Sequence, residues 1–228
     1  MNAAQQLGQV PFLTHVSPET LQSLWERGTV KHCKKGTVLI SAEDRVDALY
    51  IQLSGKSFVY TLMHTGQRKI IYILGPGSLL NQNTTEYGIS AAYIETLEPS
   101  DILSIPLSEL YALMQKDFDL VRAILTAQER KIWRLTHQQK NTISSLYMER
   151  KLAAKLWKLA RDFGVRTEKG LEIDFDMPVT FLADLLGIPR ETASRLRNTL
   201  AQQGLILVEG KRITIPDPER IVAFYKNK

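Results

Sequence analysis

The chain offers few soft metal ligands, because its 228 residues include one cysteine, Cys33, and four histidines. A single cysteine excludes an intrachain disulfide and a cysteine-ligated zinc or iron–sulfur cluster. The histidines form no close ligand pair in the sequence. We therefore expect no metal, no catalytic site and no bound cofactor, and we favour an inert Cys33 thiol over a redox role. Haem ligation through one histidine stays open. The histidines are His15, His32, His64 and His137.

Long apolar runs are also missing. No uninterrupted apolar segment approaches the roughly 18 residues that a membrane span requires. The N-terminal stretch MNAAQQLGQVPFLTH lacks a charged segment followed by an apolar one, as a signal peptide would have. The composition is that of a folded globular protein, with 44% hydrophobic and 23% charged residues. We expect a cytoplasmic protein without a membrane partner.

Positive charge is scarce in the N-terminal half. Residues 1–117 carry 9 Lys/Arg and 11 Asp/Glu, a net charge of −2, whereas residues 118–228 carry 20 and 13, a net charge of +7. A polyanionic partner is therefore expected at the C-terminal half.

Short β-rich runs alternate with glycine corners from Val30 to Ile105. Strands at this spacing predict an antiparallel barrel or roll. His64–Gln67 lies between two such runs and predicts a hairpin turn.

After Pro106 the apolar residues recur at helical spacing. From Val121 onward, apolar or neutral residues recur in alternating steps of four and three, which forms a narrow stripe. This a/d spacing predicts a coiled coil between two copies of the chain. An amphipathic helix packed on its own domain is the alternative. A hinge is expected at Asn141–Met148. The predicted dimer interface consists of Val121, Leu125, Gln128, Ile132, Leu135, Gln139, Thr142 and Leu146.

Two helical segments with a tight corner follow, VTFLADLL and PRETASRLRNTLAQQ, joined by Gly187–Ile188. The spacing of Ala183, Gly187 and Ala193 is typical of a helix-turn-helix. Pro189 is expected at the first position of the second helix. Projected at about 100° per residue, Ala193, Leu196 and Leu200 share one side of that helix.

The opposite side of this helix carries Arg190, Glu191, Ser194 and Arg195. An arginine fork matches guanine O6 and N7, and a carboxylate accepts from the cytosine amino group, so these residues are predicted to contact bases. A merely solvated face is the alternative. The hairpin around Glu209–Arg212 predicts a wing with a basic tip. The predicted contacts to the DNA backbone are Thr180, Thr192, Arg197, Asn198, Lys211 and Arg212.

These features resemble the cyclic-AMP receptor and fumarate-nitrate reductase (Crp/Fnr) superfamily of bacterial transcription regulators, over nearly the whole chain. The most specific motif is G-x-x-R-E-T-x-x-R, which begins at Gly187. The resemblance implies an α+β fold, with an N-terminal antiparallel β-roll of the cyclic-nucleotide-binding type (a double-stranded β-helix) at 1–116. It further implies a dimerisation helix at 117–146 and a winged helix-turn-helix domain at 147–228.

The resemblance also implies a homodimer that binds a double-stranded DNA operator and, as an activator, RNA polymerase near Arg166–Gly170. Arg190, Glu191 and Arg195 would read a half-site similar to TGTGA. Glu191, Ser194 and Arg195 also fit the E-x-x-S-R pattern of the oxygen-sensing branch, whose half-site resembles TTGAT. Arg190 favours the first.

The segment GSLLNQNTTEYGISAAYIETL departs from the pattern of cyclic-AMP binders. Asn81–Gln82 stands in place of Gly-Glu, and Ser90–Ala91 in place of the Arg-Ser that grips the phosphate. Without that arginine a cyclic nucleotide lacks its charge partner, so another small organic effector is expected. The segment and RKIIYILGPGSLL are similar to the halogenated-phenol-responsive branch. The predicted effector residues are Leu80, Asn81, Gln82, Asn83, Thr84, Tyr87, Ser90 and Gln128.

Several alternatives remain open from the sequence. The regulator could be constitutive, or respond to redox state or haem. The roll could be a cupin-like enzyme with the C-terminal domain as a tether, although it lacks the clustered histidines that such an enzyme uses. The winged helix could also bind a protein instead of DNA. We predict a regulator and not an enzyme.

Overall fold

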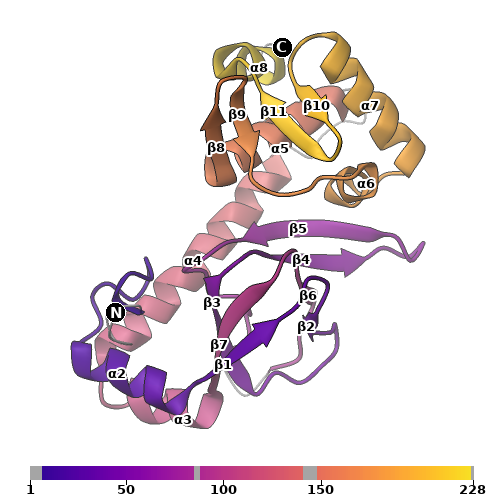
Figure 1. The fold of residues 1–228 in the computed structure, drawn as a ribbon. Coiled ribbons are helices and arrows are strands. Elements are labelled where there is room, and N and C mark those ends of the chain that lie inside the picture. The colour runs from indigo at the N-terminus through magenta and orange to yellow at the C-terminus, as the bar shows by residue number, and fades with distance from the viewer. Residues whose placement is uncertain (1–6, 85–87, 141–147, 227–228) are drawn as a thin grey trace. The chain divides into compact units, whose positions relative to one another are not determined.

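The computed structural model describes residues 7–84, 88–140 and 148–226 (Figure 1). The chain divides into two compact units: an N-terminal unit formed by residues 1–61 and 70–138, and a C-terminal unit formed by residues 139–228, with which residues 62–69 are grouped. No helix among the described residues is long and apolar enough to cross a membrane.

The N-terminal unit is built on two antiparallel sheets. One sheet has the strand order β1-β7-β3 and the other β2-β6-β4-β5. The turn predicted at His64–Gln67 joins β4 to β5, and the Met63 N–H donates to the Gln67 carbonyl at 2.8 Å. The strands are β1 (Thr29–Cys33), β2 (Val38–Ile40), β3 (Ala48–Ser54), β4 (Ser57–Leu62), β5 (Arg68–Leu74), β6 (Tyr93–Thr96) and β7 (Ser100–Pro106).

Residues alternate between two cores because successive side chains of a strand point to opposite faces. On β3, Tyr50 lies between the two sheets, whereas Leu49 and Ile51 pack toward the helices. On β7, Ile102 lies in the core between the two sheets, and Leu103 and Ile105 lie in the core between the β1-β7-β3 sheet and the helices. The predicted antiparallel β-roll is therefore confirmed.

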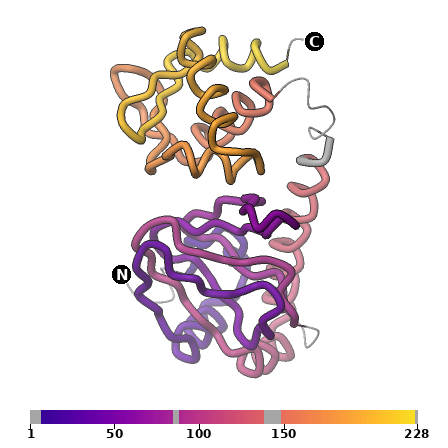
Figure 2. Tube along the Cα trace, turned by 90° about the vertical axis from the view of Figure 1, so that its right-hand side faces the viewer, coloured from indigo at the N-terminus to yellow at the C-terminus, as the bar shows by residue number. Residues whose placement is uncertain are grey.

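Three helices cover the outer face of the β1-β7-β3 sheet: α2 (Pro18–Arg27), α3 (Leu107–Met114) and the first half of α4 (Phe118–Lys140). Ser17 caps α2, because its Oγ accepts a hydrogen bond from the Thr20 N–H at 3.2 Å. α4 continues along one side of the roll (Figure 2). Residues 141–147, which include all of the predicted hinge except Met148 and the seam positions Thr142 and Leu146, lie outside the described part.

The fully buried residues of α4, which pack it on its own unit, lie outside the predicted seam. Leu120, Ala123, Ile124 and Ala127 are buried. By contrast, the seam residues Leu125, Ile132 and Leu135 expose 56%, 64% and 39% of their surface. The exposed apolar stripe is thus distinct from the face that holds α4 to the roll. Packing within the unit does not explain why these positions are apolar.

The C-terminal unit combines four helices with one antiparallel sheet of order β10-β11-β9-β8. Two hairpins are present, β8–β9 and the predicted wing β10–β11, and β9 pairs with β11 to join them. The elements are α5 (Met148–Phe163), β8 (Gly164–Thr167), β9 (Gly170–Ile173), α6 (Val179–Leu186), α7 (Arg190–Gln202), β10 (Leu207–Glu209), β11 (Arg212–Ile215) and α8 (Pro218–Lys226).

The predicted boundaries at 116/117 and 146/147 remain predictions. The structure groups α4 with the roll as far as Gln138. The α+β fold class itself is confirmed.

Candidate nucleic-acid interface and effector site

A glycine in the left-handed region forms the corner between α6 and α7. Gly187 has φ 68° and ψ 49°, and its N–H donates to the Ala183 carbonyl at 2.7 Å. The Ile188 N–H bonds to the same carbonyl at 3.1 Å. A residue with a side chain pays a steric cost at this φ, so glycine allows α6 to stop and the chain to turn within three residues.

α7 begins one residue later than we predicted. Pro189 has φ −56° and ψ 148°, which is extended, so it precedes the helix and Arg190 is the first helical residue. The fixed φ of proline suits both the first residue of a helix and the residue before it. Only ψ distinguishes these two positions. The shift leaves the face assignments of the helix unchanged.

The two faces of α7 differ as predicted. Ala193, Leu196 and Leu200 expose 0%, 6% and 0% of their surface and pack the helix onto its unit. Arg190, Glu191, Arg195 and Asn198 are exposed, and Thr192, Ser194 and Arg197 are half-buried.

The charged side chains on the exposed face of α7 have no partners within the described part of the protein. Within the described ranges, no hydrogen bond or ion pair engages the side chains of Arg190, Glu191 or Arg195. Arg197 differs, since its Nη2 donates to Asn198 Oδ1 at 3.3 Å and its Nε is buried without a partner in the described structure. Thr180, at the start of α6, is also exposed.

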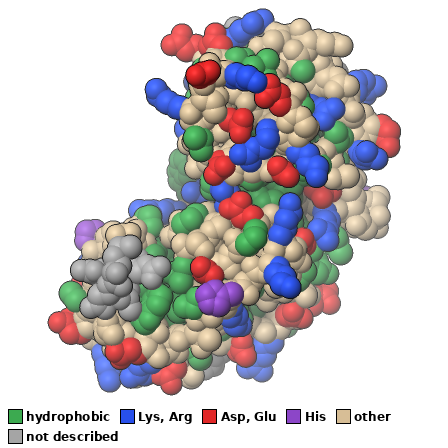
Figure 3. Space-filling model, viewed as in Figure 1, with side chains coloured by type: hydrophobic (Ala, Val, Ile, Leu, Met, Phe, Trp, Pro, Cys, Tyr) green, Lys and Arg blue, Asp and Glu red, His purple; other side chains and the backbone are tan. Residues whose placement is uncertain are grey.

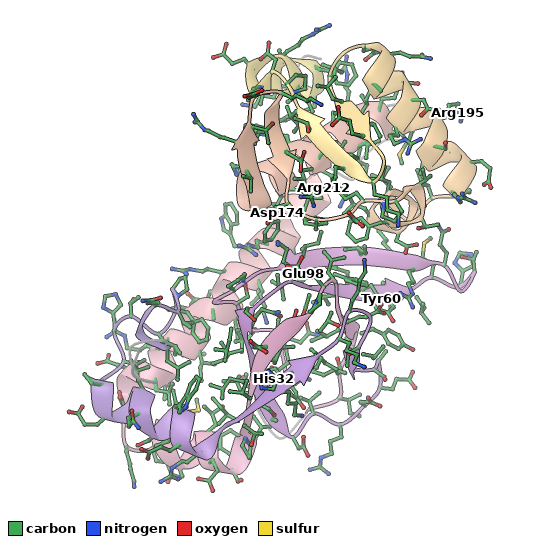
Figure 4. The ribbon with its side chains drawn as sticks, in the orientation of Figure 1. His32, Tyr60, Glu98, Asp174, Arg195 and Arg212 are labelled. Atoms are coloured by element: carbon green, nitrogen blue, oxygen red, sulfur yellow. The ribbon has the colours of Figure 1, made fainter. Side chains whose placement is uncertain are left out.

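The wing holds most of its charges in internal ion pairs. Arg212 Nε bonds to Glu172 Oε1 at 3.0 Å and its Nη2 to Asp174 Oδ1 at 3.2 Å. Lys169 pairs with Glu209. Figure 4 places Arg212 beside Asp174, away from Arg195 on α7. Basic and acidic side chains are accordingly interspersed over this face of the unit (Figure 3). Lys211, at the tip of the wing, is exposed.

The predicted effector segment lies against α4. Asn81 is buried, and its side chain serves the roll itself: Oδ1 accepts from the Tyr50 N–H at 2.9 Å, and Nδ2 donates to the carbonyls of Ala48 and Asn83. Ser90 Oγ donates to the Ala92 carbonyl at 2.7 Å. Because these polar groups are paired, neither side chain offers a ready contact to a ligand.

Side chains of α4 hold this segment in place. Gln128 Nε2 donates to the Gln82 carbonyl at 3.1 Å. Lys131 Nζ donates to the carbonyls of Leu80 and Asn81 at 3.3 and 2.7 Å. Desolvation by burial, with repulsion from Arg134, lowers the pKa of Lys131 to about 7. The predicted seam residue Gln128 therefore contacts the predicted effector segment.

A small cavity lies behind these contacts, with about 10 Å³ open to water-sized molecules. That is room for about one water molecule. Three predicted effector residues, Leu80, Gln82 and Ser90, line it. Its other lining residues are Val59, Tyr72, Ala92, Ile94 and Lys131.

Both units match known domain families. Residues 30–117 match the cyclic nucleotide-binding domain, and residues 150–224 match the Crp-like helix-turn-helix domain. The chain is a member of the Crp/Fnr superfamily. It is accordingly a DNA-binding transcription regulator with an effector-binding domain.

Curated relatives match almost the full length of this Crp/Fnr chain. The anaerobic regulatory protein of Pasteurella multocida is 29% identical over 209 residues, which cover 91% of this chain and 76% of the relative. The fumarate and nitrate reduction regulatory protein of Escherichia coli K12 is 27% identical over 213 residues, with 93% and 84% covered.

Solved structures share the fold. FixK2 from Bradyrhizobium japonicum has a TM-score of 0.72 at 19% identity, covering 86% of this chain and 96% of its own. The c-di-GMP responsive regulator CLP from Xanthomonas campestris has a TM-score of 0.76 at 17% identity, covering 88% and 100%.

Several site predictions for this Crp/Fnr member stay untested. The structure exposes the predicted base-contacting arginines and brings Leu80, Gln82, Ser90 and Gln128 to one region. Asn83 and Thr84 follow in the same segment, whereas Tyr87 lies outside the described residues. The resemblance to the halogenated-phenol-responsive branch also stays a prediction.

Sequence reasoning missed Lys131 and Tyr72. Lys131 lies in the helical stretch beside the seam, and nothing in the spacing distinguishes it from the exposed arginines Arg130 and Arg134 of α4. Tyr72 is one of several aromatic residues on apolar strands. Both come to the cavity only through packing of α4 on the roll, where Tyr72 Oη donates to the Lys131 carbonyl at 3.3 Å.

Cys33 and the histidines show no ligand cluster. Burial raises the pKa of the Cys33 thiol, with a smaller opposing effect of Lys31, so little thiolate is present at neutral pH. His32 Nδ1 lies 2.6 Å from Asp101 Oδ1 on the exposed side of β1 and β7. No group of three or more His, Cys, Asp or Glu in the described ranges could hold a metal ion.

Proposed function

We propose that the protein acts as a homodimer on duplex DNA, with α7 in the major groove of each half-site. The observation that carries this proposal is the face of α7 formed by Arg190, Glu191 and Arg195, which is exposed and unpaired in the described structure. Its donors and acceptors suit guanine and cytosine edges. We expect a half-site similar to TGTGA, with TTGAT as the alternative.

The exposed stripe on α4 supports the dimer. Leu125, Ile132 and Leu135 lie at heptad spacing and are not used in the packing of α4 on the roll. Paired stripes of two α4 helices would form the seam of a coiled coil. Dimeric helix-turn-helix proteins bind half-sites about one helical turn apart, so this seam would set the spacing of the two α7 helices.

We further propose that the effector is not a cyclic nucleotide. Ser90 is buried and bonded to the Ala92 carbonyl, and Ala91 offers no charge for a cyclic phosphate. An effector that binds between the roll and α4 would shift the packing of the two α4 helices, and only one arrangement would fit the operator. As an activator, the protein would present the loop Arg166–Gly170 to RNA polymerase.

Selection of bound sites from random DNA tests the DNA-binding role. The wild-type protein should enrich a two-fold symmetric site, and the logarithm of its affinity should fall steeply with the logarithm of salt concentration. Arg161→Ala, at an exposed arginine of α5, is the matched control and should leave both results unchanged. Weak binding without sequence enrichment would instead favour a protein-binding winged helix.

A further inference from the structure

One carboxylate on the exposed face of α7 has no basic partner within the described ranges. Glu191 lies next to Arg190 and four residues before Arg195, a spacing at which helical ion pairs form. Neither arginine binds it in the described part of the chain. The carboxylate of Glu191 is therefore available to a group outside the chain. Ion pairs hold other acidic side chains of the C-terminal unit, namely Asp162, Glu172, Asp174 and Glu209.

Helix stability accounts for only part of the position of Glu191. The residue lies in the first turn of α7, where a negative charge interacts favourably with the helix dipole. At an exposed site this interaction is weak, and it requires no particular partner. On DNA the same charge is repelled by the phosphates, so Glu191 opposes binding unless it finds a hydrogen-bond donor.

The major groove contains few donors for a carboxylate. Guanine presents the acceptors O6 and N7 there, and thymine presents O4 and a methyl group. The donors are the amino groups of cytosine and adenine. In the groove, Glu191 is thus stabilised only opposite one of these amino groups, and it disfavours each base that lacks one.

Base pairing decides which amino proton reaches the protein. In a paired cytosine or adenine, one amino N–H donates to the partner base and the other points into the major groove. Methylation of the amino nitrogen places the methyl group on the groove side whenever the pair is kept, because the pairing proton must remain. The Glu191 carboxylate then meets a carbon atom in place of a donor, and it loses water without gaining a hydrogen bond.

We propose that Glu191 makes this regulator sensitive to methylation of an amino nitrogen in its operator, as N4-methylcytosine or N6-methyladenine. Such a methyl group at the base that Glu191 contacts lowers operator affinity, so the methylation state of the operator is an input beside the effector. Arg190 and Arg195 do not share this sensitivity, since they donate to guanine acceptors, which carry no amino proton. The inference rests on the proposed DNA-reading role of α7 and names a way in which that role is regulated.

Operators with one modified base test the proposal on the full chain. Each cytosine and adenine of one half-site of the selected operator is replaced in turn by its N-methylated form. At one position the wild type should lose about 10- to 100-fold in affinity, as expected for a lost hydrogen bond to a charged group. The cytosine and adenine arms identify the base. Where the base is cytosine, 5-methylcytosine keeps both amino protons and should bind nearly as the unmodified base does.

Substitution assigns the effect to Glu191. Glu191→Ala should bind the methylated and unmethylated operators equally, because it has no acceptor to lose. Arg195→Ala keeps the carboxylate and should retain the sensitivity. Low salt strengthens the phosphate contacts of every variant, so that weak binders can be compared. A wild type that is indifferent to every modified base, or a Glu191→Ala variant as sensitive as the wild type, would overturn the proposal.

The outcome can be separated from that of the proposed function. If no site is enriched on unmodified DNA, DNA reading by α7 is rejected, and this inference with it. A sequence-specific site that tolerates every modified base would leave the regulator function intact and reject only the role of Glu191.

Discussion

Arginines of similar appearance in the sequence differ in what surrounds them. Arg195 is exposed on α7 and unpaired within the described ranges, whereas Arg212 is held by Glu172 and Asp174. An arginine that must leave two carboxylates to bind a phosphate gains less from the exchange. Lys211 is therefore the better candidate for the backbone contact of the wing.

Arg212→Ala should lower the free energy of unfolding of the C-terminal unit by about 0.5–1.5 kcal/mol, because a partly exposed ion pair with two hydrogen bonds is lost. Urea unfolding measures this. Lys211→Ala should leave stability unchanged and lower the salt slope of DNA binding by about one. The opposite pattern would restore the original prediction that Arg212 contacts phosphate.

Lys131→Met should change the pH dependence of unfolding. The pKa of Lys131 is about 7 in the folded chain and near 10.5 when unfolded, so between these values the unfolded state binds the extra proton. The cost of burying the charge is full below pH 7 and is relieved as pH rises. The stability of the wild type relative to the variant should therefore increase from pH 7 to 9, by up to about 1.4 kcal/mol per unit. Equal pH dependence of the two would show that Lys131 keeps its ordinary pKa.

The sequence predicted which side of α7 is buried, and it did not predict the contacts of the effector segment. Helical spacing alone separates Arg190 and Arg195 from Ala193 and Leu200, since one helix settles which side each residue takes. By contrast, the bonds of Asn81 and Lys131 are made between segments about 30 and 50 residues apart. Local patterns do not encode such contacts.

At the scale of elements, the corner between α6 and α7 depends on backbone conformation. Gly187→Ala places a side chain at φ 68° and should cost about 1–2 kcal/mol of stability, with weaker DNA binding because the start of α7 shifts. Gly8→Ala, which meets only Leu21 Cδ1 at 3.8 Å, is the control and should be nearly neutral. Thermal unfolding and operator binding measure both. A neutral Gly187→Ala would show that α6 can end without the left-handed residue.

Most elements were predictable because each has its own spacing of apolar residues and is bounded by glycine, proline or turn residues. The glycine-punctuated strands, the turn at His64–Gln67, the two helices around Gly187 and the hairpin at Glu209–Arg212 appear where the sequence placed them. The pairing of β9 with β11 was not predicted, because it joins residues about 40 positions apart. The start of α7 differed by one residue, since proline fixes φ but leaves ψ free.

At the scale of the whole molecule, the exposed stripe of α4 should control assembly. Leu125→Asp with Leu135→Asp should give folded monomers with little operator affinity, because both side chains are exposed in the single chain and buried in the proposed dimer. Thr126→Asp, exposed and outside the seam, should leave assembly unchanged. Sedimentation gives the molecular mass, and an unchanged dimer of the double variant would remove α4 as the interface.

Base discrimination by α7 decides whether this chain reads DNA sequence. Affinities of wild type, Arg190→Ala and Arg195→Ala should be measured on the selected operator and on operators with single base-pair changes. Each variant should lose about 1–3 kcal/mol on the selected operator and should no longer distinguish bases at one position of the half-site. Equal losses on every sequence, with discrimination intact, would contradict the assignment of Arg190 and Arg195 to base edges.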